Sequence, residues 1–402
     1  MSLSPSRPSR SRAHLRLGIA VAIALLALAA QRAHAADLKW RGLVDLVGAE
    51  SSDAFGYNVF TRLDSPFDPF RLRVFAESQV DDRLSVFSQL VFDDASTTYL
   101  DGAYVMYTPT PEQDLHVLVG KVPWAIGTYG PRTYSNKNPL VGTPLMYQYH
   151  TGLGWYAPPA TVDDLIAVTD GGDPNVGNRH YAGGMPVLWE SWWDVGVAAV
   201  GSARPVEYMV GVISGTPGWA TAGEEENSGK SVIARVGLTP IPALRIGISG
   251  SHGPYLNDFA AMFVPPGRSV NDYDQDLAMA DAEILFGHAE LRGEAFHNVW
   301  ETPTVGDLRV SGFYAEGKYT LAPGLYAAAR YDQMRFSDVA GSDGVGRPWH
   351  ADVDRLETGV GYRLNRAVLA KGVYQHFTRR ALVSSGADEK DDLFAANLVV
   401  SF

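Results

Sequence analysis

Apolar and polar side chains alternate along short runs of the chain from residue 36 onward. In the run 38–49, Leu38, Val44 and Leu46 share one face, while Lys39 and Asp45 share the other. A period of two residues predicts a β-strand, because successive side chains of a strand point to opposite faces. Fifteen further runs repeat it, at 70–80, 84–93, 98–107, 115–121, 193–202, 206–214, 231–239, 244–251, 276–286, 289–300, 308–319, 325–335, 354–364, 367–378 and 391–402. The pattern therefore predicts an all-β protein.

The connections between these runs alternate between short and long. Turns after the even-numbered runs are short and rich in Pro, Gly or Asn, whereas most loops after odd-numbered runs are long and polar, notably 215–230, 252–275, 336–353 and 379–390. An even number of strands of this length, with short turns at one end, is typical of a transmembrane barrel. We predict an antiparallel up-and-down β-barrel of about 16 strands. An extra hairpin, 162–169 with 185–189, would give 18.

The first 35 residues have the features of a cleaved signal peptide. Four arginines precede an apolar stretch at 17–30, and Ala-His-Ala at 33–35 forms a cleavage signal. No later stretch is apolar for the roughly 20 residues that a membrane-spanning helix needs. A chain that enters a membrane without such a helix must do so as a closed barrel. We therefore assign residues 1–35 to the signal peptide and 36–402 to the barrel.

The last run ends on an aromatic residue, Phe402. Phe394, Leu398 and Val400 lie on the same face as Phe402. This run resembles the C-terminal strand of bacterial outer-membrane β-barrels. The resemblance implies the outer membrane of a Gram-negative cell as the location, outer-membrane lipid as the surroundings, and the barrel-assembly machinery as a partner that reads Phe402.

The connection 122–192, after the fifth run, is much longer than an ordinary loop. Residues 120–127, Gly-Lys-Val-Pro-Trp-Ala-Ile-Gly, resemble the Gly-Lys/Gln-x-x-x-Pro-Phe-Gly stretch of phosphate-selective-type and related trimeric porins, with the Pro one place earlier and Trp-Ala-Ile replacing the Phe. The resemblance implies a homotrimer and a third external loop that folds into the barrel and narrows the pore. An external cap or a trimer contact is the alternative. The candidate constriction residues are Arg132, Tyr134, Asn136, Lys137, Asp163 and Asp164.

Strand parity separates the lipid-facing side chains from those that face the lumen. An arginine on the lipid face near the bilayer midplane would cost about 2–4 kcal/mol, so charged positions must line the lumen. The candidate pore-lining residues are Arg71, Arg73, Glu77, Arg235, Arg245, Glu290, Arg292, Glu294, Arg330, Arg355, Glu357, Arg363 and Lys371. Rings of charge set ion preference. We expect this basic wall to face acidic residues of the long connection across the pore.

Composition narrows the functional classes. Five of the 33 basic residues lie in the signal peptide, which leaves 28 against 45 acidic residues, and such an acidic chain argues against nucleic acid as a partner. With no cysteine, the chain has no disulfide and no attachment site for c-type haem. The sequence also indicates no other cofactor and no metal site.

The leading prediction is a porin, a passive diffusion channel for small hydrophilic solutes or ions. Two alternatives remain: the barrel sheath of a porin–cytochrome electron conduit, and an outer-membrane enzyme. The histidines have no nucleophile partner at a recognisable spacing, so we predict no catalytic residues and no enzyme. A tryptophan-rich track that guides sugars is a further option, because five tryptophans lie in or beside the long connection.

Overall fold

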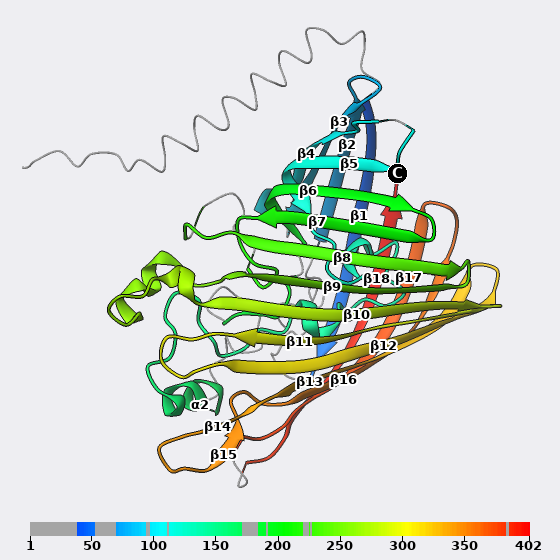
Figure 1. The fold of residues 1–402 in the computed structure, drawn as a ribbon. Helices are drawn as coiled ribbons and strands as arrows, with labels where there is room; N and C mark the ends of the chain where they lie inside the picture. The colour runs from blue at the N-terminus through cyan, green and yellow to red at the C-terminus, as the bar shows by residue number, and fades with distance from the viewer. Residues whose placement is uncertain are drawn as a thin grey trace, which may run out of the picture.

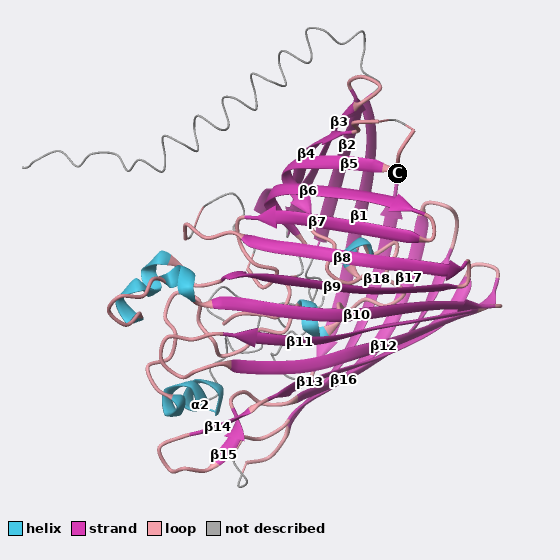
Figure 2. Cartoon of the chain, in the orientation of Figure 1, coloured by secondary structure: helices cyan, strands magenta, loops and turns pink. Residues whose placement is uncertain are grey.

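The computed structural model describes residues 38–52, 70–93, 97–110, 112–170, 184–189, 192–219, 225, 227–382 and 386–402. The assigned signal peptide lies outside these residues. Sixteen antiparallel strands form one closed barrel (Figures 1 and 2). The predicted fold class and the sixteen strands are confirmed. Within the described residues, no helix has both the length and the apolar character needed to cross a membrane.

The structure has the following helices and strands. The barrel strands are β1 (Leu38–Ser51), β2 (Phe70–Gln79), β3 (Leu84–Asp93), β4 (Thr97–Tyr107), β5 (Leu115–Pro123), β6 (Trp193–Ala203), β7 (Val206–Ile213), β8 (Ser231–Ile241), β9 (Leu244–Pro254), β10 (Asp274–Phe286), β11 (Ala289–Trp300), β12 (Leu308–Ala322), β13 (Leu325–Phe336), β16 (Val353–Arg363), β17 (Val368–Arg379) and β18 (Glu389–Ser401). Outside the wall are the strands β14 (Asp338–Ala340) and β15 (Gly346–Pro348), the helix α2 (Val162–Asp170), and the 3₁₀ helices η1 (Gly130–Thr133), η2 (Leu145–Tyr147), η3 (Asp258–Phe263) and η4 (Val270–Asp272).

The barrel has two unlike ends. Tight turns join β2 to β3, β8 to β9, β10 to β11 and β12 to β13 at one end, which we call the short-turn end. The opposite, long-loop end carries α2, η3, η4 and the β14–β15 hairpin (Figure 2). This asymmetry matches the turn and loop lengths expected from the sequence.

The barrel closes where β1 pairs with both β2 and β18. The last residue takes part, since the Gly42 N–H donates to the Phe402 carbonyl at 2.8 Å and the Phe402 N–H donates to the Gly42 carbonyl at 3.0 Å. The Phe402 ring lies directly over Gly42, where an added Cβ would stand 2.1 Å from the ring. Only glycine at position 42 leaves room for this terminal ring.

The outer face is apolar, and the interior is polar or tightly packed. On β8, Val232 and Val236 are each 49% exposed, whereas the neighbouring Ile233 and Arg235 are buried. The same alternation leaves valine, leucine, isoleucine and aromatic side chains exposed on the outside of most other strands. A lipid-facing outside and a charged inside follow from the two-residue period of the strands.

The eighteen-strand alternative is wrong. Residues 162–170 form helix α2, and 185–189 contribute no strand, only an isolated bridge between His150 and Pro186. A capping box starts α2: the Asp164 N–H donates to the Thr161 hydroxyl, and the Thr161 N–H donates to the Asp164 carboxylate, each at 3.1 Å. Each bond gives a partner to a backbone N–H group at the start of the helix, where the helix itself supplies none.

Candidate functional site: the barrel interior

The described residues between β5 and β6, namely 124–170, 184–189 and 192, form what we call the inner segment. Tryptophans, tyrosines and leucines of this segment share one buried cluster with inward-facing residues of the wall, such as Phe296 and Met334. Trp124, Tyr149 and Leu153 are at most 1% exposed. The inner segment therefore packs against the inner face of the barrel.

Carboxylates of the wall hold the backbone of the inner segment. One oxygen of Glu357 on β16 accepts hydrogen bonds from the N–H groups of Val141 (3.1 Å) and Gly142 (2.8 Å). Asp332 on β13 accepts another from the Leu145 N–H at 3.1 Å. Hydrogen bonds from backbone amides to a buried carboxylate are charge-assisted and strong. These three bonds fix residues 141–145 to the wall.

Cations of the wall hold carbonyl groups of the same stretch. The buried ammonium of Lys371 on β17 donates to the carbonyls of Ser135 (2.9 Å), Asn138 (3.3 Å) and Leu140 (2.8 Å). The guanidinium of Arg355 donates to the Thr143 carbonyl. Every donor of Lys371 therefore meets a backbone acceptor, which suits an ammonium that is taken out of water.

Glu294 on β11 anchors the first part of the inner segment. Its carboxylate accepts from the Thr128 hydroxyl at 2.9 Å and from the Tyr147 hydroxyl at 2.6 Å. Gly127 lies at the closest approach, with a φ of 66° and room for no Cβ between Tyr147 and Glu294. The glycine that ends the 120–127 motif is thus required by geometry.

A buried ion-pair network lies behind these contacts. Arg330 contacts Glu357 (2.5 Å), Glu316 (3.3 Å) and Asp332 (3.3 Å), and Arg355 contacts Asp332 at 3.1 Å. All five side chains are at most 2% exposed. Glu316 is absent from the predicted set, although it follows Tyr314 and precedes Lys318 on the inward face of β12. The strand alternation alone would have found it.

The other predicted wall residues also face inward, in three environments. Arg71 and Arg73 are buried, Arg73 beside Asp45 at 3.4 Å. Arg292 lies between Glu290 (2.9 Å) and Glu316 (3.5 Å). Arg235 is buried in the middle of β8, and the remaining ones lie nearer the short-turn end: Glu77, Arg245 and Arg363.

The six candidate constriction residues divide into two groups. Arg132 pairs with Glu283 of β10 (2.7 Å), whereas the Tyr134 hydroxyl donates to Gln89 of β3 (2.7 Å) and Asn136 donates to Ser401 of β18 (3.3 Å). Because β10 lies across the barrel from β3 and β18, this stretch crosses the lumen, and Lys137 beside it is exposed.

Asp163 and Asp164 lie elsewhere, exposed on α2. Asp163 accepts from the Ser342 N–H at 3.0 Å, and Asp164 caps the helix. The expected opposition of these two acids to the basic wall is therefore wrong, because both lie on α2 at the long-loop end, and the buried Arg330 and Arg355 of the wall pair with wall carboxylates instead.

His350 joins the inner segment to the long-loop end. Its Nε2 lies 3.0 Å from the Tyr149 hydroxyl and its Nδ1 lies 3.1 Å from the Thr169 hydroxyl of α2. Burial, together with the nearby Arg379 guanidinium, holds the pKa of His350 well below its usual value. The imidazole is therefore neutral and bridges two hydroxyl groups.

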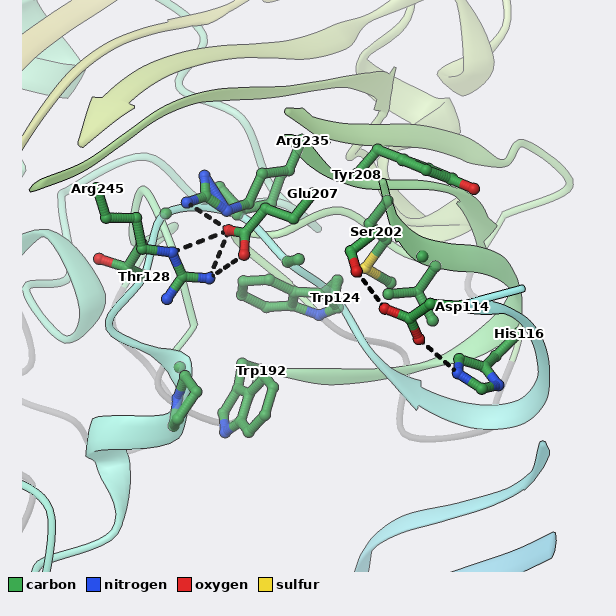
Figure 3. A pocket seen from close by; sticks show the side chains of 18 residues that line it. Asp114, His116, Trp124, Thr128, Trp192, Ser202, Glu207, Tyr208, Arg235 and Arg245 are labelled. Carbon is green, nitrogen blue, oxygen red and sulfur yellow. Dashed lines mark hydrogen bonds and ion pairs between the residues drawn. The ribbon is translucent and has the colours of Figure 1, made fainter. Parts of the chain in front are cut away.

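A cavity of about 430 Å³ lies between the inner segment and strands β5–β9 (Figure 3). Trp124 and Trp192 face it on one side. Glu207 accepts hydrogen bonds from Arg245 and, at 3.4 Å, from Arg235, whose other partner is Asp281 at 2.8 Å. The two guanidinium groups and two carboxylates leave this part of the cavity wall without net charge.

Histidines of the described residues contact hydroxyl groups and carboxylates of the wall and its turns. His116, near the start of β5 at the short-turn end, lies between the Thr108 hydroxyl (2.8 Å) and Asp114 (3.0 Å). His297 contacts the Ser311 hydroxyl at 2.8 Å. Among the described histidines, no hydrogen bonds link one imidazole to both a serine and a carboxylate, and no group of three metal-binding side chains occurs in that part of the chain.

A closed antiparallel barrel with an apolar outside and an ionic inside defines the fold class of outer-membrane β-barrels. Several solved structures share this fold. The outer membrane protein OmpT of Vibrio cholerae with loop L8 deleted has a TM-score of 0.55 and 14% identity, over 92% of this chain and 100% of that chain. The trimer form of in-vitro folded OmpT gives 0.52 and 13%, with 92% and 100% covered.

OmpF of Salmonella typhi, in a complex with daunomycin, gives a TM-score of 0.54 and 12% identity, over 91% of this chain and 98% of that chain. At these identities the likeness shows the fold alone. No family model matches the chain, and no curated protein matches its sequence.

Proposed function

We propose that this protein is a channel of the outer membrane through which small hydrophilic solutes or ions diffuse, with passage limited by the inner segment. The observation that carries the proposal is the bonding of this segment to ionic groups of the wall, chiefly Glu357 and Lys371. A barrel of sixteen strands encloses more space than its own side chains fill. The inner segment occupies part of that space and leaves charged groups in contact with water.

Water-exposed charges support a wet lumen at the short-turn end. The side chains of Arg41, Glu77 and Arg245 are 70%, 52% and 42% exposed. Charged groups facing the interior would be costly in a dry core. The same charged side chains keep their hydration in a water-filled lumen, through which a hydrated solute can pass.

Ion pairing divides the wall arginines into two roles. Arg330 and Arg355 are fully buried among carboxylates, so they fix the structure and add little net field. Selection by charge then depends on exposed cations near the short-turn end, such as Lys39 and Lys137, which take part in no ion pair within the described residues. This division modifies the expectation that all wall arginines act on the solute.

The same proposal includes export through the signal peptide, recognition of Phe402 during assembly, and a homotrimer in the outer membrane. The existence of a trimer form of the similarly folded OmpT of Vibrio cholerae supports the trimer. The role of a sheath around a cytochrome is disfavoured, because the inner segment is bonded to the inner face of β10, β11 and β17. It therefore fills interior space that an enclosed cytochrome would need.

Planar bilayers test the channel directly. Purified, folded protein is added at low concentration to a bilayer in potassium chloride, and current steps are recorded. We expect discrete steps whose size grows with salt concentration. Heat-unfolded protein serves as the control, and a folded sample that produces no steps would contradict the proposal.

A further inference from the structure

A second cavity, of about 250 Å³, opens near the short-turn end, against strands β1–β3 rather than β5–β9. Residues of β1, β2 and β3 form its wall, and residues 134–137 of the inner segment form its roof. Three candidate constriction residues, Tyr134, Asn136 and Lys137, and the candidate wall residue Glu77 meet here, together with residues that the sequence did not single out.

The charge of this cavity is positive. Lys39, Arg41 and Lys137 line it against the carboxylate of Glu77, which lies 3.9 Å from Arg41, and the terminal carboxylate of Phe402. Lys39 and Lys137 are exposed and take part in no ion pair within the described part of the chain. Two ammonium groups therefore remain available, in contrast to the neutral cavity beside Glu207.

Aromatic rings cover the inner wall of the same cavity. Phe75, Phe87 and Tyr134 line it, with ring centroids 6.5 Å apart for Phe75 and Phe87, and 5.4 Å apart for Phe75 and Tyr134. Phe87 also stacks on Trp193 at 5.7 Å, which continues the aromatic surface along the lumen. All three lining rings remain partly exposed.

Partly exposed rings inside a polar lumen call for a ligand with an apolar part. The strand pattern places charged or small polar residues at many inward positions, so phenylalanine at positions 75 and 87 is not required by a wet wall. Rings offset at about 5–7 Å leave faces and edges that accept a further ring. Ammonium and guanidinium groups beside them would bind a carboxylate.

We propose that this cavity binds small aromatic carboxylates, of which benzoate is the simplest, and thereby makes them preferred solutes of the channel. The proposal rests on the proposed channel function and names its substrate class. The carboxylate lies toward Lys39, Arg41 and Lys137, and the ring packs against the aromatic wall of Phe75, Phe87 and Tyr134. The volume is suited to a single ring with short substituents.

Equilibrium dialysis of the folded, full-length mature protein in detergent tests the binding with labelled benzoate. Acetate keeps the charge without the ring, and benzyl alcohol keeps the ring without the charge. We expect each to compete at least tenfold more weakly than unlabelled benzoate. Equal competition by acetate, or by benzyl alcohol, would overturn the proposal.

Variants locate the site. The double variant Lys39→Gln with Lys137→Gln should weaken benzoate binding about tenfold, because it removes two charge-assisted contacts. Phe87→Leu should weaken benzoate but leave acetate unchanged. Lys390→Gln, an exposed lysine near the start of β18, is the matched control and should bind as the wild type does. Unchanged benzoate binding in the double variant would overturn the assignment.

Chloride conductance of the same preparations separates the two proposals. Current steps in chloride, together with dialysis that shows no preferential binding of benzoate, would refute the substrate class and leave the proposed channel function intact. Variant-sensitive benzoate binding without current steps would refute the channel and keep the site.

Discussion

Replacement of Glu357 by glutamine tests whether wall charges hold the inner segment in place. The substitution keeps the size of the side chain and removes its charge. Glu357 is 0% exposed. One of its oxygens accepts hydrogen bonds from the Val141 and Gly142 N–H groups, and the other accepts a hydrogen bond from the Arg330 guanidinium. The amide nitrogen of glutamine cannot accept a hydrogen bond, so at least one of these contacts is lost.

The expected cost is about 3 kcal/mol. Breaking a buried ion pair by removing one partner costs about 3–5 kcal/mol. Arg330 keeps Glu316 and Asp332 as partners, which places the effect at the lower end of that range. Since the lost bonds hold residues 141 and 142, the weakened part is the inner segment rather than the barrel wall.

Two measurements check this expectation. Single-channel recordings should show larger or noisier current steps for Glu357→Gln than for the wild type, and limited proteolysis should cleave the inner segment faster. Glu290→Gln is the matched control, because Glu290 bonds to Lys318 and Arg292 of the wall and is partly exposed. If both variants conduct and resist protease as the wild type does, wall charges do not hold the segment.

Three further predictions follow from other contacts. Lys371→Met should release the carbonyls of residues 135, 138 and 140 and destabilise the protein by about 2–4 kcal/mol in urea unfolding, whereas an unchanged midpoint would contradict the anchoring role. The pKa of His350 is lowered in the folded state, so the unfolded chain takes up the proton first as the pH falls below about 6.5. The free energy of unfolding should therefore fall by about 1 kcal/mol from pH 7 to 5.5. In His350→Gln it should depend less on pH over this range. Gly42→Leu should displace the Phe402 ring and lower the yield of folded barrel, measured by heat-modifiable migration on gels, while Gly344→Ala, in an open loop, should fold normally with a small loss of stability.

The strands could be predicted because the membrane demands an apolar residue at every second position. All sixteen predicted runs coincide with wall strands to within a few residues. The same alternation assigned Glu357, Lys371 and Arg330 to the interior. Helix α2 was missed because its nine residues are too few to display a helical period, although Thr161 and Asp164 carry the capping-box signal.

The partners of the wall charges could not be predicted. Glu357 and Lys371 bind backbone amides and carbonyls of the inner segment, and every residue type offers these groups. No spacing or composition marks such contacts. The neutral pairing of the wall arginines was likewise hidden, because it depends on strand register rather than on the number of charges.

The seam between β1 and β18 joins positions that are distant in the chain, such as Leu46 and Asn397, which are 351 residues apart. Each shorter ribbon of strands would have two unsatisfied borders, which hydrocarbon does not tolerate. Partial intermediates therefore have no stable resting place within the bilayer. Insertion into the membrane and closure of the barrel must therefore be coupled. Phe402, whose ring covers Gly42, makes the last backbone hydrogen bonds of the seam.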